Sequence, residues 1–550
     1  MPRPSKRPPV VTHSVVERAR TTTSVALTNP YLLERHSSIS TIEWCASMNT
    51  LLSPSGSTNS TTIHRDFWLF SWPLLVCVAV YLGSLLAGAR LLNDGDTYLH
   101  IASGQWILAH GAAPVTDPFS HTMPGAVWTA HEWLSEVVLA IIYNISGWTG
   151  VVALTALMFA ITLALLARTL LKFLEPIYAL LFVVLGASMT MEHLLARPHI
   201  LATPLMMIWT IGLVRAREGG RAPSWWLLPV MTLWANMHGG FTLGLALIGV
   251  FALEAVLAAR QEQRAFSVAK SWAVFLLLAV LCSLLTPHGV QGILYTWQVL
   301  AQLSYALETI GEWQSPNFRQ VTPMEVWLLA GMAMFMFQGL KLPPIRLLLL
   351  LGLLHLALKH GRYVELLGLL VPVFIAEPLA AQWKQKSQQP GQAQAIDRFF
   401  HKLARPAGAG AITLAAGCLL ALMLLASRAQ PVQPNQLIAP TLAISAVQAA
   451  GIRGPVLNEY TWGGYLIFSG IAPFIDGRAD MYGDAFLKAY AEALALKEAD
   501  GLETLMRKYK IEWTLLPPDT PAVTLLDHLP GWRRLYADKV AVVHVKVGAE

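Results

Sequence analysis

Two acidic residues and a histidine lie directly behind the first long apolar run of the chain. Asp94 and Asp96 are separated by one glycine, and His100 follows Asp96 by four residues. Carboxylates there can act as general bases on a hydroxyl, bind a divalent cation, or lie as ordinary polar groups among lipid headgroups. Residues four apart share a helix face, so His100 can assist Asp96. We predict that Asp94, Asp96 and Glu132 are catalytic. We also predict that His100 and His131 bind substrate.

The loop that holds these residues carries no positive charge. Residues 91–167 include no Lys or Arg, although the formal net charge of the chain is +6. Basic residues collect in the cytoplasmic loops of membrane proteins, so a loop without them is expected outside. We predict an outer catalytic loop at 93–147, with surface helices at about 97–110 and 132–145. A zinc site of His100, His121 and His131 is an alternative that neither HExxH nor CxxC spacing supports.

Four basic residues fall on the outer side in spite of this rule: Arg197, Arg319, Lys359 and Arg362. Chance can place them there, but a lipid-linked phosphate at the outer surface needs cationic partners. The planar guanidinium group of arginine matches phosphate oxygens. We predict substrate binding by Arg197 and His199 in the sequence ARPH, and by Lys359 and Arg362 in KHGR. Arg319 is more typical of an ordinary loop charge.

Other outer turns carry further polar residues. His238 precedes two glycines, which permit either a broken helix or a tight reversal. Glu312 and Trp313 lie in GEWQSPN, where an indole beside polar groups suits a sugar face or anchors the chain at the membrane interface. We predict that these three residues bind substrate.

A third polar motif, DGRAD, lies near the C-terminus. It places Asp476, Arg478 and Asp480 within five positions. These side chains can contribute to acceptor binding above the membrane. Equally, Asp476 and Arg478 can fix a turn in the fold. We predict all three as substrate-binding and keep the turn as the alternative.

Composition indicates the class of protein. Of 550 residues, 55% are hydrophobic and only 13% are charged, against about a quarter in soluble proteins, and the mean hydropathy is +0.49. Repeated apolar runs of near-spanning length predict a polytopic α-helical membrane protein in contact with the lipid bilayer. The basic excess belongs to cytoplasmic loops, so we expect no nucleic-acid partner. The four cysteines are scattered and show no disulfide framework.

The positive-inside rule gives one consistent topology with about eleven spans, the N-terminus inside and the C-terminus outside. Residues 1–65 are predicted to be a disordered cytoplasmic tail, 66–428 the multi-span membrane domain, and 429–550 a small α/β domain outside the cytoplasm. In that domain we expect strands at 455–458, 465–468, 473–475, 511–516 and 540–545, and helices at 484–499 and 502–509. The predicted spans are 66–92, 148–168, 176–192, one ending near 214, 224–236, 240–259, 270–286, 323–339, 346–358, 362–380 and 408–425.

With these features the chain resembles the GT-C superfamily of membrane glycosyltransferases, which includes protein mannosyltransferases and lipid A aminoarabinose transferases. Their first outer loop opens with Asp-Glu-x-x-Tyr, and here Asp94 and Tyr98 have the matching spacing in DGDTY. Gly95 replaces the second acid, a role that Asp96 can take. His131 and its neighbours replace the usual Pro-rich opening of the second surface helix. The resemblance implies a substrate-binding role for Tyr98.

A narrower resemblance is to a group of bacterial membrane proteins whose chemistry is inferred from the superfamily. They carry DGDTYxHIAxGxWIL, DPFSHT, EWQSPxF, YxWGGYLI and FIDGRADxYG, and all five motifs occur here. This resemblance extends over most of the chain from residue 66 onward, and it implies a place in the bacterial cytoplasmic (inner) membrane.

The resemblance also implies a reaction. A polyprenyl-phosphate-linked sugar lies in the outer leaflet, Asp94 takes the proton of an acceptor hydroxyl, and Arg197 or Arg362 stabilises the leaving phosphate. The acceptor can be a glycan, a lipid or a protein. No cofactor is required, although Asp96 with Glu132 leaves a divalent metal open. The alternative functions are a transporter or flippase of lipid-linked glycans, for which Glu254 is the deep-span candidate, and a non-catalytic envelope-assembly scaffold.

Overall fold

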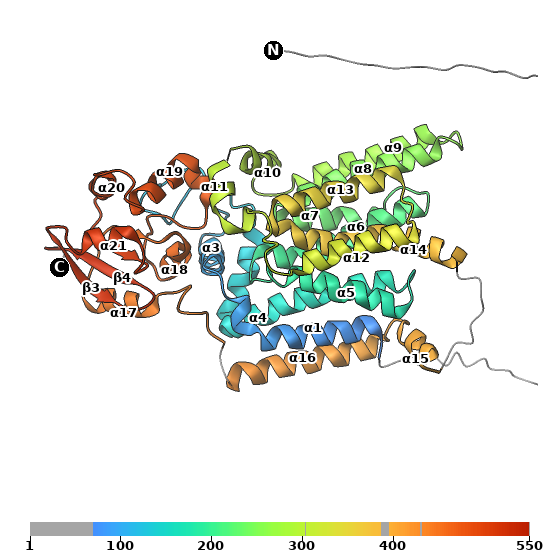
Figure 1. Ribbon diagram of the computed structural model, residues 1–550, viewed down its shortest axis with the longest axis horizontal. Helices are drawn as coiled ribbons and strands as arrows, with labels where there is room; N and C mark the ends of the chain where they lie inside the picture. The colour runs from blue at the N-terminus through green and yellow to red at the C-terminus, as the bar shows by residue number, and fades with distance from the viewer. Residues whose placement is uncertain (1–69, 303, 387–394, 430–431, 549–550) are drawn as a thin grey trace, which may run out of the picture. The chain divides into compact units, whose positions relative to one another are not determined.

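The computed structural model describes residues 70–302, 304–386, 395–429 and 432–548 (Figure 1). Contacts between Cα atoms join the described residues into one compact unit. The predicted cytoplasmic tail lies outside the described residues.

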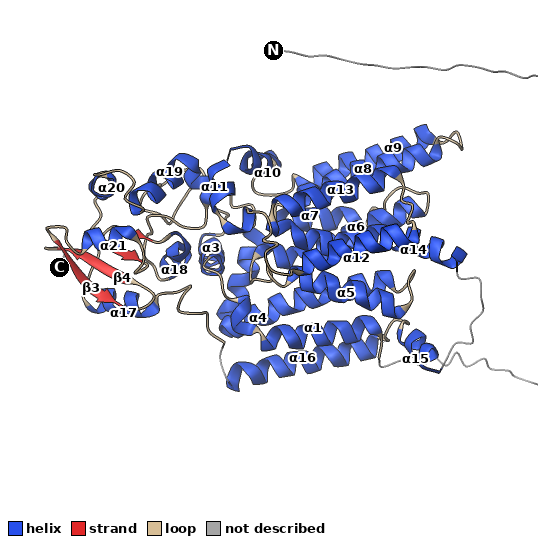
Figure 2. Ribbon diagram, viewed as in Figure 1, coloured by secondary structure: helices blue, strands red, loops and turns tan. Residues whose placement is uncertain are grey.

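Helices make up most of the described chain, and strands occur only near the C-terminus (Figure 2). Each of the eleven predicted spans contains a helix. Six helices, α4, α6, α8, α9, α14 and α16, are long and apolar enough to cross a membrane; α1, α5, α7 and α12 are shorter and apolar. The eleven-span count and the orientation stay predictions. The bounds are α1 Trp72–Leu86, α4 Trp133–Leu170, α5 Pro176–Thr190, α6 Pro198–Glu218, α7 Leu227–Met237, α8 Phe241–Ala259, α9 Ala265–Ser283, α12 Pro323–Gln338, α13 Pro344–Lys359, α14 Val364–Lys386 and α16 Ala409–Ala429.

Two helices follow the Asp94 motif, as the sequence predicts. The first is α3, Asp96–His110, which ends at Gly111 with φ 69°, a left-handed conformation that glycine adopts without strain. The second is the N-terminal part of α4. Gly147, with φ 59° and ψ −154°, interrupts α4 and separates 133–146 from the apolar segment that follows. This break lies between the predicted surface helix and the predicted span. The remaining short helices are α2 Gly88–Leu91, α10 Val290–Gln302, α11 Ser304–Thr309, η1 Gly311–Trp313, η2 Gly361–Tyr363 and α15 Ala395–Leu403.

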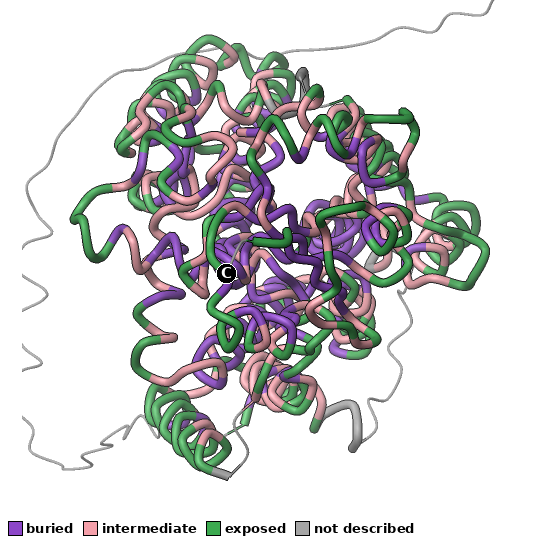
Figure 3. Tube along the Cα trace, turned by 90° about the vertical axis from the view of Figure 1, so that its left-hand side faces the viewer, coloured by how far each residue is buried: buried purple, intermediate pink, exposed green. Residues whose placement is uncertain are grey.

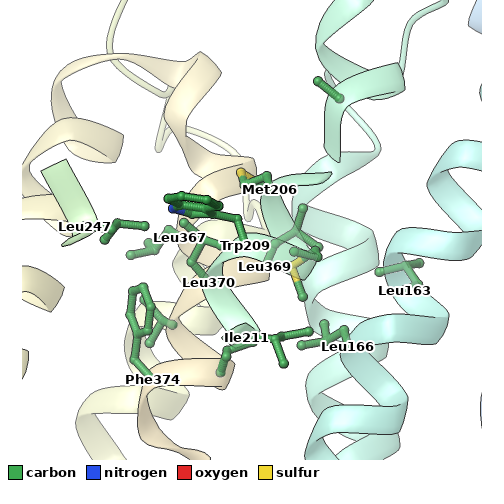
Figure 4. Packing of buried hydrophobic residues seen from close by; sticks show 14 of the residues in the cluster. Leu163, Leu166, Met206, Trp209, Ile211, Leu247, Leu367, Leu369, Leu370 and Phe374 are labelled. Carbon is green, nitrogen blue, oxygen red and sulfur yellow. The ribbon is translucent and has the colours of Figure 1, made fainter. Parts of the chain in front are cut away.

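Apolar side chains hold the membrane helices together. In Figure 4, Trp209 of α6 lies among residues of α8 and α14, including Leu247 and Leu370. Its indole nitrogen donates a hydrogen bond of 2.9 Å to the Gly244 carbonyl, so the one polar atom of this buried ring is satisfied. Figure 3 shows buried residues gathered in the interior and exposed residues around the periphery.

One buried ionic cluster interrupts this apolar interior. Arg346 at the start of α13 donates to Glu254 of α8 at 2.9 Å and to the Phe374 carbonyl at 2.9 Å. Arg217 near the end of α6 lies 3.1 Å from the same Glu254 carboxylate. Each charge therefore has an opposite charge beside it, as burial requires.

The C-terminal part contains a four-stranded sheet of order β1-β2-β4-β3. Strand β2 pairs with β1 in parallel and with β4 antiparallel, and β3 joins β4 antiparallel. The predicted strand at 465–468 is wrong, because these residues belong to helix α18; the predicted strand at 473–475 is also wrong, because no strand forms there. Helix α19 begins five residues earlier than predicted, and β3 was not predicted. The bounds are α17 Thr441–Ala449, β1 Val456–Asn458, η3 Tyr460–Trp462, α18 Gly463–Phe468, α19 Ala479–Leu494, α20 Gly501–Lys508, β2 Trp513–Leu516, α21 Pro521–Leu526, β3 Trp532–Ala537 and β4 Val542–Lys546.

Candidate active site

Two carboxylates of the DGD motif and a third from a distant part of the sequence meet on one guanidinium group. Arg197, extended before Pro198 at the start of α6, contacts both carboxylate oxygens of Asp94, through Nε and, at 2.8 Å, through Nη2. It also donates to Asp96 at 2.9 Å and, through Nη1, to Glu312 of η1 at 2.6 Å. The structure thus brings together four of the predicted site residues. Four of the five N–H donors of Arg197 are used by this set.

The two aspartates differ in their electrostatic surroundings. Burial raises the pKa of Asp94, but the charge and hydrogen bonds of Arg197 outweigh it and hold the pKa below its usual range. For Asp96, burial is the larger effect. Together with the negative charge of Asp94, burial raises the pKa of Asp96 to about 6 against the attraction of Arg197. Asp96 therefore changes protonation near neutral pH.

A second group of side chains surrounds Glu132, the residue just before α4. His131 Nε2 and His238 Nε2 lie 3.6 and 3.5 Å from one oxygen of Glu132. Burial raises the pKa of Glu132, but the charge and hydrogen bond of His131 outweigh it and hold the pKa well below its usual range. Glu132 is therefore ionised at neutral pH. Burial lowers the pKa of His238 to about 4, so that ring is neutral.

His100 lies between these two groups. Its Nδ1 is 3.2 Å from Glu136 Oε1 on the facing helix α4. Its charge affects Asp94 and Asp96 on one side and Glu132 on the other. Burial lowers the pKa of His100, but the hydrogen bond to Glu136 and the charge of Glu132 outweigh it, so the net pKa is raised.

Tyr295 of α10 extends the second group toward the C-terminal part. Its ring lies 4.2 Å from the His131 ring, centroid to centroid, with 30° between the planes. Its hydroxyl interacts with the carboxylate of Asp480 at the start of α19. The predicted residues His131 and Asp480 are thus linked by a tyrosine that the sequence analysis missed. The amphipathic pattern of residues 290–302 was the available signal for this helix.

Arg362 is the cation of the site that no carboxylate neutralises. Its guanidinium carbon lies 4.2 Å from the ring centroid of Trp313, and within the described ranges no carboxylate lies within ion-pair distance of it. Burial is the main effect that lowers the pKa of His238, and the charge of Glu132 opposes it. The positive charge of Arg362 lowers this pKa further. Lys359, predicted with it, has an exposed side chain; its backbone carbonyl accepts from Ser315.

Two predicted residues have local partners of their own. Tyr98 is buried in α3, and its ring packs edge-on against Trp148, Tyr465 and Phe468 at 4.7, 5.2 and 5.2 Å. His199 Nε2 lies 3.0 Å from the His193 carbonyl oxygen, and its ring centroid is 6.3 Å from that of His238.

The C-terminal part contacts the Asp94–Asp96 loop through glycines. A Cβ atom on Gly477 would overlap the Asp96 carboxylate, and one on Gly95 would overlap the Thr461 carbonyl oxygen. The DGDTY, YxWGGYLI and FIDGRADxYG motifs therefore pack directly on one another.

Arg478 fixes this arrangement. It donates to Asp476 at 2.7 and 2.6 Å and to Asp117 of the DPFSHT motif at 2.7 Å, and its guanidinium carbon lies 4.7 Å from the centroid of the Trp128 ring. Asp476 is fully buried and Arg478 is 4% exposed. Of the two interpretations of this pair, the geometry favours the one that fixes a turn.

The cation between Asp94, Asp96 and Glu312 is the guanidinium group of Arg197. Throughout the described residues, no group of three or more His, Cys, Asp or Glu side chains is arranged to hold a metal ion.

An apolar groove of about 640 Å³ adjoins the Glu132 group. It begins at Trp133, the neighbour of Glu132, and includes Asn236, which accepts a 2.8 Å hydrogen bond from the Trp133 indole. Its other lining residues are Leu134, Leu228, Pro229, Thr232, Leu233, Cys282 and Leu285.

Comparisons with known proteins show the fold. No protein-family model and no curated protein matches the sequence. The oligosaccharyltransferase of Archaeoglobus fulgidus in the apo form is similar with a TM-score of 0.50 and 10% identity, over 81% of this chain and 69% of that one. This likeness shows a shared fold.

Two further solved structures are similar at lower scores. AglB of the same organism, in complex with an inhibitory peptide and a dolichol-phosphate, has a TM-score of 0.47 and 12% identity over 81% of this chain and 69% of that one. ArnT from Cupriavidus metallidurans bound to undecaprenyl phosphate has a TM-score of 0.45 and 13% identity over 86% of this chain and 98% of that one.

Proposed function

We propose that this protein transfers a sugar from a polyprenyl-phosphate donor to an acceptor hydroxyl at the outer face of the cytoplasmic membrane. The observation that carries the proposal is that three features occur in the same region of the fold. These are a carboxylate that titrates near neutrality, an arginine without a carboxylate partner, and an apolar groove in the membrane part. The resemblance of DGDTY to the GT-C motif supports the same donor class. In this proposal the tail is cytoplasmic and residues 429–550 lie outside.

The groove suits the isoprenoid chain of the donor. A lipid tail needs an apolar surface, and eight of the nine lining residues present apolar or weakly polar side chains. The groove starts one residue from Glu132, and Asn236 is two residues before His238. A tail lying there places its headgroup beside the polar cluster.

Arg362 is our candidate for the leaving phosphate. Arg197 already contacts three carboxylates, so a phosphate there would have to displace them. Arg362 is held by the face of Trp313 and keeps its N–H donors for an anion. The charge that develops on the phosphate as the sugar leaves would then be stabilised by a guanidinium group in place before the reaction.

We assign the general base to Asp96 rather than to Asp94. A base works best when its pKa is near the operating pH, and the pKa of Asp96 is about 6. Asp94 is a weaker base, because Arg197 holds its ionised form. In the reaction, the acceptor oxygen bonds to the anomeric carbon, the bond from that carbon to the phosphate oxygen breaks, and the hydroxyl proton passes to Asp96.

The test compares cells with and without the protein. Without it, sugar-linked polyprenyl phosphate should accumulate in lipid extracts, and one glycosylated envelope product should disappear, both measured by mass spectrometry. The wild-type chain should restore the pattern and Asp96→Asn should not. Identical lipid and envelope profiles with and without the protein would refute the proposed function. Restoration by Asp96→Asn would refute only the choice of base.

A further inference from the structure

Glu132, His131, Tyr295 and Asp480 form a compact group that the proton transfer and the phosphate contact do not use. The group combines two aromatic rings, those of His131 and Tyr295 with centroids 4.2 Å apart and planes tilted by 30°, with two carboxylates. Protein sites that bind sugars need these two elements: a ring for the apolar face of the sugar, and charged acceptors for its hydroxyl groups.

The side chains of this group keep access to a ligand. His131 and Glu132 are 21% and 17% exposed, so their polar edges are not sealed by protein. The histidine contacts of Glu132, at 3.5 and 3.6 Å, are also longer than the charge-assisted bonds of about 2.8 Å that Arg197 makes. A hydroxyl group can therefore still bond to this carboxylate.

The position of the group follows from the proposed donor geometry. The lining of the apolar groove includes Trp133, the sequence neighbour of Glu132, and the charge of Arg362 affects both His238 and Tyr295. A donor with its tail in the groove and its phosphate on Arg362 would carry its first sugar toward Glu132 and the His131–Tyr295 pair.

We propose that Glu132, His131, Tyr295 and Asp480 form the subsite that binds the donor's sugar, and that it accepts a sugar without a carboxylate group. This inference rests on the proposed function. The exclusion of acidic sugars follows from charge: a sugar carboxylate would face Glu132 and Asp480. The positive charge of His131 is already paired with Glu132, and Arg362 is assigned to the phosphate. Asp480 belongs to the C-terminal part, so this part supplies a wall of the donor site.

The test measures binding of the purified full chain in lipid nanodiscs to three probes: undecaprenyl phosphate, undecaprenyl phosphate carrying a neutral hexose, and the same lipid carrying a hexuronate. Wild type should bind the hexose lipid more tightly than the bare lipid and the uronate lipid more weakly than the hexose lipid. Glu132→Gln and Tyr295→Leu should weaken binding of the hexose lipid by about tenfold and change that of the bare lipid by less than about twofold.

Two further variants serve as controls. Tyr295→Phe keeps the ring and removes only the contact to Asp480, so it should lose less affinity than Tyr295→Leu and covers the case in which the leucine variant folds poorly. Arg362→Gln should weaken binding of all three lipids. Equal losses for bare and hexose lipids in Glu132→Gln, or a uronate lipid bound as tightly as the hexose lipid, would overturn the subsite. A wild-type protein that binds none of the three lipids would instead refute the proposed function.

Discussion

Asp94 and Asp96 stand two residues apart, and their different bonding to Arg197 separates their roles. Asp94 has both oxygens on the guanidinium group, and Asp96 has one. The first is therefore suited to holding Arg197 in place, and the second to exchanging a proton. This division depends on tertiary contacts more than a hundred residues apart in sequence, so the DGD motif alone could not predict it.

A pH profile separates the two aspartates. Activity of the wild-type protein should fall as the pH drops below about 6, because the base is then protonated. In Asp94→Asn the fall should move to lower pH, since the negative charge of Asp94 is one of the effects that raise the pKa of Asp96. The rate of sugar transfer is measured from pH 4.5 to 8, with Asp96→Asn as the inactive reference. A profile of Asp94→Asn that keeps its midpoint or moves to higher pH would contradict this assignment.

At the scale of elements, two glycines place the catalytic loop against the C-terminal part, and they should respond differently to the same substitution. In Gly477→Ala the new methyl group meets the end of the Asp96 side chain, which can rotate away. We expect activity to fall by about tenfold or more, as the base leaves its position, with little loss of stability. Transfer rate and unfolding temperature are measured together.

In Gly95→Ala the methyl group meets the backbone carbonyl of Thr461, which cannot rotate away. This variant should lose about 1–3 kcal/mol of stability. Gly249→Ala in α8 is the matched control, because no atom lies within 4 Å of its new Cβ; it should keep wild-type activity and lose no stability, since alanine is the better helix former. If Gly477→Ala and Gly95→Ala change the transfer rate and the unfolding temperature by the same amounts, the Asp96 side chain does not yield more easily than the Thr461 backbone, and this prediction is wrong.

Arg478 joins the outer loop to the C-terminal part through fully buried carboxylates. Arg478→Met would leave Asp476 and Asp117 without their cation, and breaking such a buried pair costs about 3–5 kcal/mol. We expect a clearly lower unfolding temperature and faster proteolysis between residues 430 and 548. Arg534→Met is the control, because its pair with Asp527 is 46% exposed on the arginine side and should contribute little. An Arg478 variant as stable as this control would exclude a structural role.

At the scale of the whole molecule, the structural features that depend on local sequence pattern could be predicted from the sequence. Apolar runs of sufficient length placed helices in all eleven predicted spans, and the predicted boundary between 145 and 148 coincides with the break at Gly147. The short run 465–468 was assigned as a strand, because periodicity over four apolar residues does not distinguish strand from helix. The convergence of Arg197, Glu312 and Asp96 was beyond prediction, since it depends on how helices far apart in sequence pack.

The other end of the helix bundle carries the Glu254–Arg346 cluster, about 30 Å from Arg197 along α6 at 1.5 Å per residue. The transporter alternative would use such ionisable groups, but Arg346 and Arg217 already pair with Glu254. We therefore interpret this cluster as structural. Arg346→Ala should lose about 3–5 kcal/mol of stability, because Glu254 loses its main partner in an apolar interior.

The double variant Arg346→Ala, Glu254→Ala should recover part of this loss. It removes one positive and one negative charge together, so Glu254 no longer stands as a buried charge without its main partner. The recovery is partial, because Arg217 loses Glu254 and Glu218 loses Arg346. Arg264→Ala is the matched control, since the Arg264–Glu262 pair is 64% exposed on both sides and should contribute almost nothing. Unfolding is followed in detergent, and sugar transfer is measured at a temperature where every variant is folded. A folded Arg346→Ala protein that has lost transfer or lipid movement would argue for a functional pathway through the cluster.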